Sequence, residues 1–488
     1  MICTVNKKIA YRILLSIPIF FILLLNSMTV LAATTTEEFL EEAEARKELP
    51  IETDSIERWP AGPKIGAEGA VLMEVNTGTI LYSKNKDEKL YPASITKMLT
   101  ALIAVDECDM DEMVTFSDAA IHSINWKEDA NMGINVGNSI TMEQCLYGLL
   151  VGSANEVAYA IAEHISGDGN IAGFADLMNK KAAELGCKNS HFITPNGIHD
   201  DDHYTSPYDM ALIAKAFYSN ELLTKMASTT SYKVPQTETQ PRDDMVVWAK
   251  SKLHPGKEYA YEYLVGTKTG FTTQARQTLV SCAEHNGLKL VCVIMMEESP
   301  YQFTDTIELF DYGFNNFKSV NIAENDTTYV IQSLNFFSTT SDIFGSSKAI
   351  LQMNKDDYIV LPGDADIEDT VSKIHYDNLD EKTLAEVDYY FNDIYVGSAG
   401  IEAAVDDHPI FDFGPKVIPE NVKEEETKVT VINIQRIILI ILAVALGLIV
   451  IFGLRALIAS KIKSKRRRGL IEKHRKGGTK NLDWSDFL

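Results

Sequence analysis

The chain has 488 residues, and its 45% hydrophobic and 23% charged content is ordinary for a protein that buries a core, which excludes a largely disordered or collagen-like chain. The net charge of −24 is unevenly spread: residues 1–32 carry +3 and residues 455–488 carry +8, which leaves −35 for residues 33–454. An acidic body repels the phosphate backbone, so we expect no nucleic-acid partner.

Two apolar segments predict export and membrane attachment. Residues 1–32 have a basic start, an apolar run over Ile13–Leu25 and small residues at the end, as in a signal peptide, with an uncleaved anchor as the alternative. Residues 433–459 predict a transmembrane helix, because Ile437–Leu454 is uncharged and long enough to span a bilayer. The basic tail, 460–488, is then cytoplasmic and the acidic body extracellular. The alternative is a buried core helix beside a solvated basic patch.

The exported body shows several predicted regions in chain order. Residues 33–63 form an acidic leader, which we expect to be loosely attached. Residues 64–318 begin with a predicted strand hairpin at Ala70–Glu74 and Thr79–Ser83. Four predicted helices follow, at Ser94–Val105, Thr141–Leu150, Asn155–Ile165 and Phe174–Leu185. Two predicted strands end the region, at Leu279–Ala283 and Leu288–Met295. This order predicts an α+β fold with an antiparallel sheet flanked by helices.

Beyond the helices and strands of residues 64–318, the pattern changes again. Residues 319–412 show short alternating strands, including Thr328–Ile331, Tyr358–Leu361 and Asp388–Phe391, and predict a small β-rich domain. Residues 413–432 are charged and predict a stalk that leads to the membrane.

The chain has six cysteines, at positions 3, 108, 145, 187, 282 and 292. Removal of the signal peptide leaves an odd five at irregular spacings, and no Cys-x-x-Cys or His-rich zinc spacing occurs. We therefore expect no disulfide framework, no metal and no cofactor.

The first motif with chemical potential is Ser94-Ile95-Thr96-Lys97, which follows Pro92 at the predicted start of a helix. A serine and a lysine three residues apart lie on one helical face. The helix N-terminus favours a developing alkoxide, and a buried neutral amine can accept the serine proton. The same spacing occurs at Ser83–Lys86 and Ser460–Lys463, so coincidence is the alternative for this motif alone.

The second motif is Ser153-Ala154-Asn155, between two predicted helices. A turn at this place can present a hydroxyl and an amide to a cleft. Serine and asparagine are also favoured at helix N-caps, so a purely structural cap is the alternative.

The third motif is Lys268-Thr269-Gly270, which precedes Phe271 and a predicted strand. It offers a cation, a hydroxyl and a backbone that can approach closely, which suits a bound carboxylate. The alternative is an ordinary turn with an exposed lysine.

The three motifs in this order, 59 and then 115 residues apart, form the signature set of penicillin-binding proteins and serine β-lactamases. Over about residues 64–318 the chain resembles the D-alanyl-D-alanine carboxypeptidase family, the low-molecular-weight penicillin-binding proteins. The segments Phe192–Asp200, His203–Ser206 and Thr304–Phe317 add to this resemblance.

The resemblance implies a role for each motif residue. Ser94 would be the acylated nucleophile and Lys97 its general base. Ser153 would relay a proton to the leaving D-alanine, and Asn155 would hold the peptide amide of the substrate. The substrate-binding residues would be those of the third motif and its neighbour: Lys268, Thr269, Gly270 and Phe271. Lys268 and Thr269 would orient the terminal carboxylate of the substrate. The backbone N–H groups of Ser94 and Phe271 would form the oxyanion hole.

The resemblance also implies an activity. The chain would be a membrane-anchored serine carboxypeptidase that removes the terminal D-alanine from peptidoglycan stem peptides through a Ser94 acyl-enzyme, with β-lactams as covalent inhibitors. One alternative is a β-lactamase, although no Glu-x-x-Leu-Asn stretch lies between Asn155 and Lys268. Another is a non-catalytic penicillin-binding scaffold of the cell wall.

Three residues near the motifs leave their roles open. Arg276 stands where the family usually has glycine, and it could pair with a substrate carboxylate or narrow the site. His199 and His203 lie in a loop that borders the predicted cleft, and each could instead be a loop histidine with its hydrogen bonds satisfied.

Overall fold

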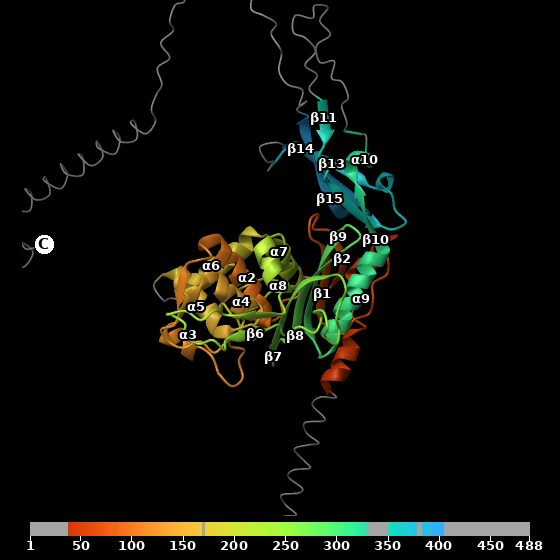
Figure 1. Cartoon of the computed structure of the whole chain (residues 1–488). Helices are drawn as coiled ribbons and strands as arrows, with labels where there is room; N and C mark the ends of the chain where they lie inside the picture. Colours follow the sequence, from red (N-terminus) through yellow and green to blue (C-terminus); the bar gives the residue numbers. More distant parts are fainter. Residues whose placement is uncertain (1–37, 168–170, 327, 330–349, 378–382, 405–488) are drawn as a thin grey trace, which may run out of the picture. The chain divides into compact units, whose positions relative to one another are not determined.

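The computed structural model describes residues 38–167, 171–326, 328–329, 350–377 and 383–404 (Figure 1). The predicted signal peptide, stalk, transmembrane segment and cytoplasmic tail lie outside these residues. Half of the strand predicted at Thr328–Ile331 also lies outside them, and its two described residues, 328 and 329, form a turn. No helix within the described ranges is both long and apolar enough to cross a bilayer.

A five-stranded antiparallel sheet forms the centre of residues 64–318, in the order β2-β1-β9-β8-β7. Its strands are β1 (Gly69–Glu74), β2 (Ile80–Lys84), β7 (Leu264–Thr272), β8 (Arg276–His285) and β9 (Leu288–Glu297). β1 and β2 form the predicted hairpin, and β1 also pairs with β9. The beginning and the end of this region therefore lie side by side, as the order of predicted elements indicated.

The sheet is buried on both faces. Along β1, Val71 and Met73 belong to a core shared with most of the helices, whereas Ala70 and Leu72 belong to a second core shared with α9 (Tyr301–Asn316). Side chains alternate between the faces of a strand, so a strand covered on both sides is apolar at every position. Figure 1 shows this layering, with α9 on one side of the sheet and the helices labelled α2 to α8 on the other.

The large helical layer contains the four helices that the sequence predicts. The predicted helix at Ser94–Val105 begins as a 3₁₀ turn, η2 (Ala93–Thr96), and continues as an α-helix. The helices of this layer are α2 (Lys97–Glu107), α3 (Asp118–His122), α4 (Met142–Leu150), α5 (Asn155–Ser166), α6 (Ile171–Glu184), α7 (Pro207–Tyr218) and α8 (Glu221–Ser228). Two hairpins of three-residue strands border it: β3 (Met113–Thr115) with β4 (Ser139–Thr141), and β5 (Ser231–Lys233) with β6 (Val246–Trp248).

The described part of the acidic leader packs against residues 64–318, so the expected loose attachment is wrong for residues 38–63. A helix over residues 38–46 precedes η1 (Glu52–Ser55). Arg46 is buried, and its Nε donates to the carbonyl oxygen of Gly66 at 2.7 Å. The indole N–H of Trp59, also buried, donates to the carbonyl of Leu81 at 2.9 Å. These side chains anchor a segment whose composition is otherwise that of a solvated surface.

The region after α9 is rich in strands. β10 (Phe317–Asn321) pairs with β12 (Tyr358–Pro362), and a separate sheet has the order β11-β15-β14-β13. The remaining elements are α10 (Ile322–Asn325), β11 (Ile350–Met353), η3 (Ile367–Asp369), β13 (Val371–His375), β14 (Thr383–Phe391) and β15 (Ile394–Ala404). The strands predicted at Tyr358–Leu361 and Asp388–Phe391 lie in β12 and β14.

Candidate active site

Ser94 and Lys97 contact each other at the junction of η2 and α2. The Nζ of Lys97 lies 2.7 Å from the Oγ of Ser94, and the helical spacing of three residues accounts for this. Lys97 is fully buried, whereas Ser94 is half-buried. A reagent from outside can therefore reach the hydroxyl but not the amine behind it.

The surroundings of Lys97 suit a neutral amine. Its Nζ lies 2.6 Å from Oδ1 of Asn155 and 2.9 Å from the carbonyl oxygen of Asn196, in addition to Ser94. The two carbonyl-type oxygens can only accept, so they take the two N–H bonds of a neutral amine. The lone pair of the amine then faces the hydroxyl of Ser94, which is the arrangement that proton removal from Ser94 needs.

The second motif forms a turn rather than a simple helix cap. Ala154, not Ser153 or Asn155, is the N-cap of α5, and it makes no capping hydrogen bond. Ser153 has φ +58°, a left-handed conformation that is uncommon outside glycine. This conformation directs its hydroxyl toward Lys268, while Asn155, the first residue of α5, faces Lys97. The capping alternative for this motif is therefore wrong.

The third motif lies on β7, and its lysine is buried. The Nζ of Lys268 donates to Oγ of Ser153 at 2.8 Å and to the carbonyl of Thr269 at 2.7 Å. The alternative of an exposed lysine in a turn is wrong. Thr269 is half-buried beside it, and the side chain of Phe271 is 55% exposed.

Gly270 lets β7 approach the backbone of Ser94. A Cβ at this position would lie 2.8 Å from the backbone nitrogen of Ser94 and 2.3 Å from Oγ1 of Thr278. Thr278 in turn donates to the carbonyl of Pro92 at 2.8 Å and so fixes the turn that carries Ser94. The three motifs, far apart in the sequence, thus form one connected site.

Burial and a neighbouring positive charge make each of the two lysines a weaker base than an exposed lysine. Burial, followed by the positive charge of Lys268, holds the pKa of Lys97 well below its usual range. Burial, followed by the charge of Lys250, lowers the pKa of Lys268 to about 7. Lys97 can therefore act as a base at neutral pH, and Lys268 is ready to gain its charge when an anion binds beside it.

A polar pocket borders Lys268 and Thr269. Besides Lys268 and Thr269, the polar residues that line this pocket are Thr229, Lys250, Ser251, His254 and Thr267. Two lysines and several hydroxyl groups make this pocket suitable for a small carboxylate.

Arg276 does not direct its side chain at the three motifs. Its Nε donates to Glu298 at 2.8 Å, and its guanidinium carbon lies 3.8 Å from the ring centroid of Phe39. It has φ +55°, which accounts for the glycine that the family usually has at this position. The suggestions that it pairs with a substrate carboxylate or narrows the site are not supported by these contacts.

The two loop histidines also have structural partners. His203 is buried, and its Nδ1 accepts from the backbone N–H groups of Ile193 and Thr194, while its Nε2 lies 2.9 Å from Oγ1 of Thr96. Burial lowers the pKa of His203 to about 4, so it stays neutral. The ring of His199 packs edge-on against Tyr91.

Sequence reasoning missed two groups that organise the site. One is the backbone carbonyl of Asn196, which no side-chain pattern could identify. The other is Glu156, which is fully buried beside Asn155 and accepts from the N–H of Met132 at 2.7 Å. Its place directly after the second motif was the available signal.

A family model described as D-alanyl-D-alanine carboxypeptidase matches residues 56–299, which is half of the chain. The chain belongs to this family. DacF of Bacillus subtilis, a D-alanyl-D-alanine carboxypeptidase, is 31% identical over 264 residues, which are 52% of this chain and 63% of DacF. The predicted family and the predicted enzyme class, a serine-type carboxypeptidase, are confirmed.

Two solved structures of the family resemble this fold. The DD-transpeptidase of Streptomyces K15 has a TM-score of 0.50 at 28% identity, with 52% of this chain and 100% of that chain covered. Penicillin-binding protein 5 of Haemophilus influenzae has a TM-score of 0.56 at 25% identity, and the match covers 70% of this chain and 98% of that chain. The predicted antiparallel sheet with flanking helices is therefore the fold of this family.

Proposed function

We propose that this chain removes the terminal D-alanine from peptidoglycan stem peptides through an acyl-enzyme on Ser94, while attached to the cell membrane. The contact between Nζ of Lys97 and Oγ of Ser94, at 2.7 Å in a buried site with a second lysine, carries this proposal. Relatives named D-alanyl-D-alanine carboxypeptidases support the choice of substrate.

Acylation begins when the neutral amine of Lys97 takes the proton of Ser94. Oγ then attacks the carbonyl carbon between the two D-alanines, and the negative charge moves to the carbonyl oxygen. The backbone N–H groups of Ser94 and Phe271 would donate to this oxyanion, a contribution worth about 3–4 kcal/mol for one donor elsewhere. The C–N bond breaks as the proton taken up by Lys97 passes through Ser153 to the leaving amine, which returns Lys97 to its neutral form; Ser153 also contacts Lys268.

The substrate is oriented by its terminal carboxylate. The positive charge of Lys268 and the hydroxyl of Thr269 would bind this group at the edge of the polar pocket. Asn155 would use its amide N–H to hold the peptide, since its Oδ1 faces Lys97. A water molecule then attacks the ester, again with Lys97 as base, and Ser94 is regenerated.

The two alternatives predict different products. A β-lactamase would release hydrolysed penicillin rapidly, because deacylation would be fast. A non-catalytic scaffold would be acylated without releasing D-alanine. The carboxypeptidase would form an acyl-enzyme with β-lactams that breaks down only slowly, and it would hydrolyse the peptide.

The decisive experiment uses the detergent-solubilised full chain with a fluorescent penicillin and a pentapeptide that ends in D-Ala-D-Ala. We expect covalent labelling and D-alanine release, both absent in Ser94→Ala. The matched control is Ser83→Ala, which changes a second Ser-x-x-Lys serine whose hydroxyl donates to Glu52 at 3.0 Å. Labelling of Ser94→Ala at the normal rate would contradict the assigned nucleophile.

The membrane attachment is tested separately. We expect the full chain to sediment with membranes, and a chain that ends at residue 430 to be released into the medium. Release of the full chain after a carbonate wash would contradict an integral transmembrane segment.

A further inference from the structure

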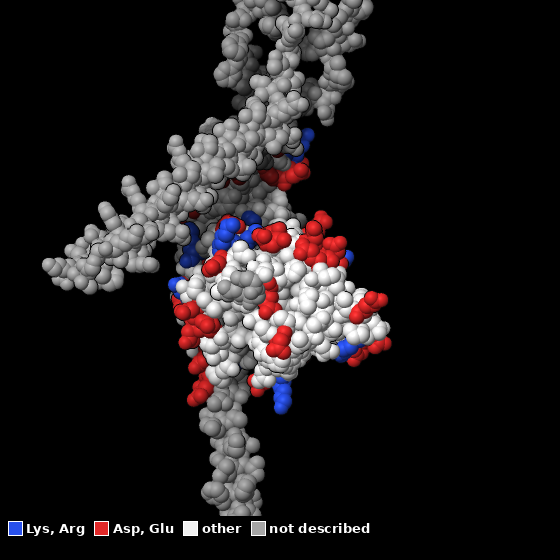
Figure 2. All heavy atoms as spheres, turned by 90° about the vertical axis from the view of Figure 1, so that its left-hand side faces the viewer, with Lys and Arg blue, Asp and Glu red and all other residues white. Residues whose placement is uncertain are grey.

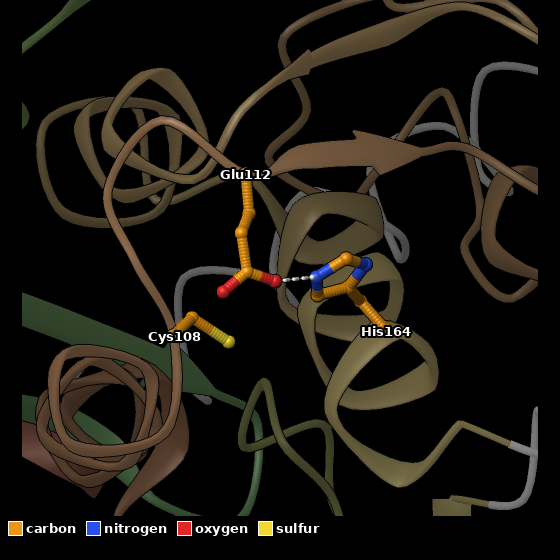
Figure 3. A group of neighbouring side chains, drawn as sticks. All are labelled: Cys108, Glu112 and His164. Carbon is orange, nitrogen blue, oxygen red and sulfur yellow. Dashed lines mark hydrogen bonds and ion pairs between the residues drawn. The ribbon is translucent and has the colours of Figure 1, made fainter.

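Three side chains with metal-binding atoms meet away from the active site (Figure 3). Cys108 is the C-cap of α2, Glu112 ends the turn that follows, and His164 lies in the last turn of α5. One sulfur, one carboxylate oxygen and one imidazole nitrogen all lie within 4.8 Å of one another. Nε2 of His164 and Oε2 of Glu112 are 2.9 Å apart.

The set of donor atoms points to a particular kind of ion. A thiolate, an imidazole and a carboxylate are the ligands that zinc takes in proteins, with bonds of about 2.0–2.3 Å. Magnesium and calcium prefer oxygen atoms only. Three protein ligands leave one tetrahedral position for water, and all three side chains are partly exposed, so an ion can enter.

The backbone already holds the turn in place. Oε1 of Glu112 accepts from the N–H of Asp109 at 2.7 Å, which leaves Oε2 directed at His164. The carbonyl of Glu112 accepts from the N–H of Met142 at 2.8 Å and ties the turn to the start of α4. A ligand whose second oxygen is fixed loses little freedom on binding a metal.

The surrounding charge favours a cation. The carboxylates of Glu107, Asp109 and Glu112 lie close enough to the Cys108 thiol to act on it electrostatically. Their negative charge attracts a divalent ion, which compensates for the charge of the thiolate when it binds. Acidic side chains also lie around much of the face of the molecule in Figure 2.

The position of the cluster connects it with the active site. α2 begins at Lys97 and is followed by its C-cap, Cys108, and α5 begins at Asn155 and carries His164 near its end. The two helices are joined at their beginnings by the 2.6 Å contact between Lys97 and Asn155. The cluster joins the same two helices at their other ends.

We propose that Cys108, Glu112 and His164 bind one Zn²⁺ ion, which fastens the ends of α2 and α5 and so keeps Lys97 and Asn155 in register. The thiol proton of Cys108 is released to solvent, and the imidazole proton moves to Nδ1 as Nε2 binds the metal. The ion takes no part in the peptidase chemistry, so this proposal does not depend on the proposed function.

The test measures metal binding by the full chain after it has been stripped with a chelator. With Zn²⁺, we expect Cys108→Ser and His164→Gln each to bind one ion fewer than the wild type, with an affinity loss of about 100-fold or more. With Co²⁺, the wild type gains the near-ultraviolet charge-transfer band of a thiolate ligand, and Cys108→Ser lacks it.

Two control variants separate this site from other thiols and histidines. Cys187→Ser removes a half-buried cysteine that contacts the carbonyl of Asp209, and His375→Gln removes the histidine of a second cluster on β13 and β14. Both keep the ion and the cobalt band. Without metal, we expect the thermal midpoint of Cys108→Ser to equal that of the wild type. With excess Zn²⁺, we expect the thermal midpoint to rise by about 4 °C in the wild type and the two controls but not in Cys108→Ser.

A wild-type cobalt complex without the thiolate band would overturn the proposal. So would equal zinc stoichiometry in Cys108→Ser, His164→Gln and the wild type. If Cys108→Ser is unstable without metal, the zinc stoichiometry of His164→Gln decides between the outcomes. Glutamine is polar like histidine and position 164 lies at the end of a helix, so we expect this variant to fold.

Discussion

Substitution of Gly270 by alanine tests the close approach of β7 to the nucleophile. The added Cβ would lie 2.8 Å from the backbone nitrogen of Ser94, whereas ordinary contact begins at 3.4 Å. The strand and the turn must therefore separate by about 0.6 Å at this point. A displacement of about 1 Å in a catalytic group costs about 100-fold in rate, so a shift of about 0.6 Å corresponds to about 16-fold, and we expect Gly270→Ala to lower the acylation rate by about 10- to 30-fold.

The second contact of the new Cβ distinguishes strand displacement from a side-chain clash. Oγ1 of Thr278 would lie 2.3 Å away, and truncation of this residue removes that clash alone. Because the backbone of Ser94 does not change, we expect Gly270→Ala/Thr278→Ala to remain at least about 10-fold slower than Thr278→Ala. Overpacking of this kind also destabilises a protein by about 1–3 kcal/mol.

The assay is the second-order rate constant for labelling by a fluorescent penicillin, with the thermal midpoint measured in parallel. The matched control is Gly173→Ala in α6, where the nearest atom to an added Cβ is 3.8 Å away. We expect that variant to label at the wild-type rate. Labelling of Gly270→Ala within threefold of the wild type, with a normal thermal midpoint, would refute the argument.

Three further predictions concern charge. The pKa of Lys268 is lowered to about 7, so the lysine loses its charge as pH rises, and kcat/KM for the peptide falls above about pH 7; in Lys268→Arg this decline should be absent up to about pH 10. An unchanged decline would exclude Lys268 as its source. Burial raises the pKa of Glu156 from 4.5 to about 7, so the folded state holds this proton more tightly and the free energy of unfolding falls by about 3 kcal/mol as pH rises from 4.5 through 7. Denaturant titrations of Glu156→Gln should show a flatter dependence, and an identical slope would contradict the assignment. Arg276→Gly relieves a strained backbone but loses the contacts with Glu298 and Phe39, so we expect penicillin labelling within threefold of the wild type and a thermal midpoint lower by about 3 °C; a tenfold loss of labelling would give Arg276 a role in the site.

The parts of the fold that were predictable have a strong local signal. The hairpin of β1 and β2 follows from two apolar runs around Gly78, which has φ +79° in the turn. The long helices follow from their apolar periodicity. The pairs β3–β4 and β5–β6 were not predicted, because a strand of three residues has too few positions to show an alternation.

The error about the leader has a different physical origin. Its many acidic residues indicate a solvated segment, and composition averages over the few side chains that matter. Trp59 packs against Phe317, with ring centroids 5.1 Å apart, and Ala43 is buried. A few anchoring residues are enough to fix a segment whose other side chains stay in water.

The side chains that meet in the candidate site were predictable, but the state of the site was not. The motifs name Ser94, Lys97 and Lys268, yet whether Lys97 is neutral depends on burial and on a second positive charge, which arise only when β7 lies beside α2. The two oxygens that face Lys97 come from Asn155 and from the backbone of Asn196, 41 residues apart in the sequence. A backbone carbonyl has no sequence signature, so a motif can identify the proposed base, Lys97, but cannot show what keeps its amine basic.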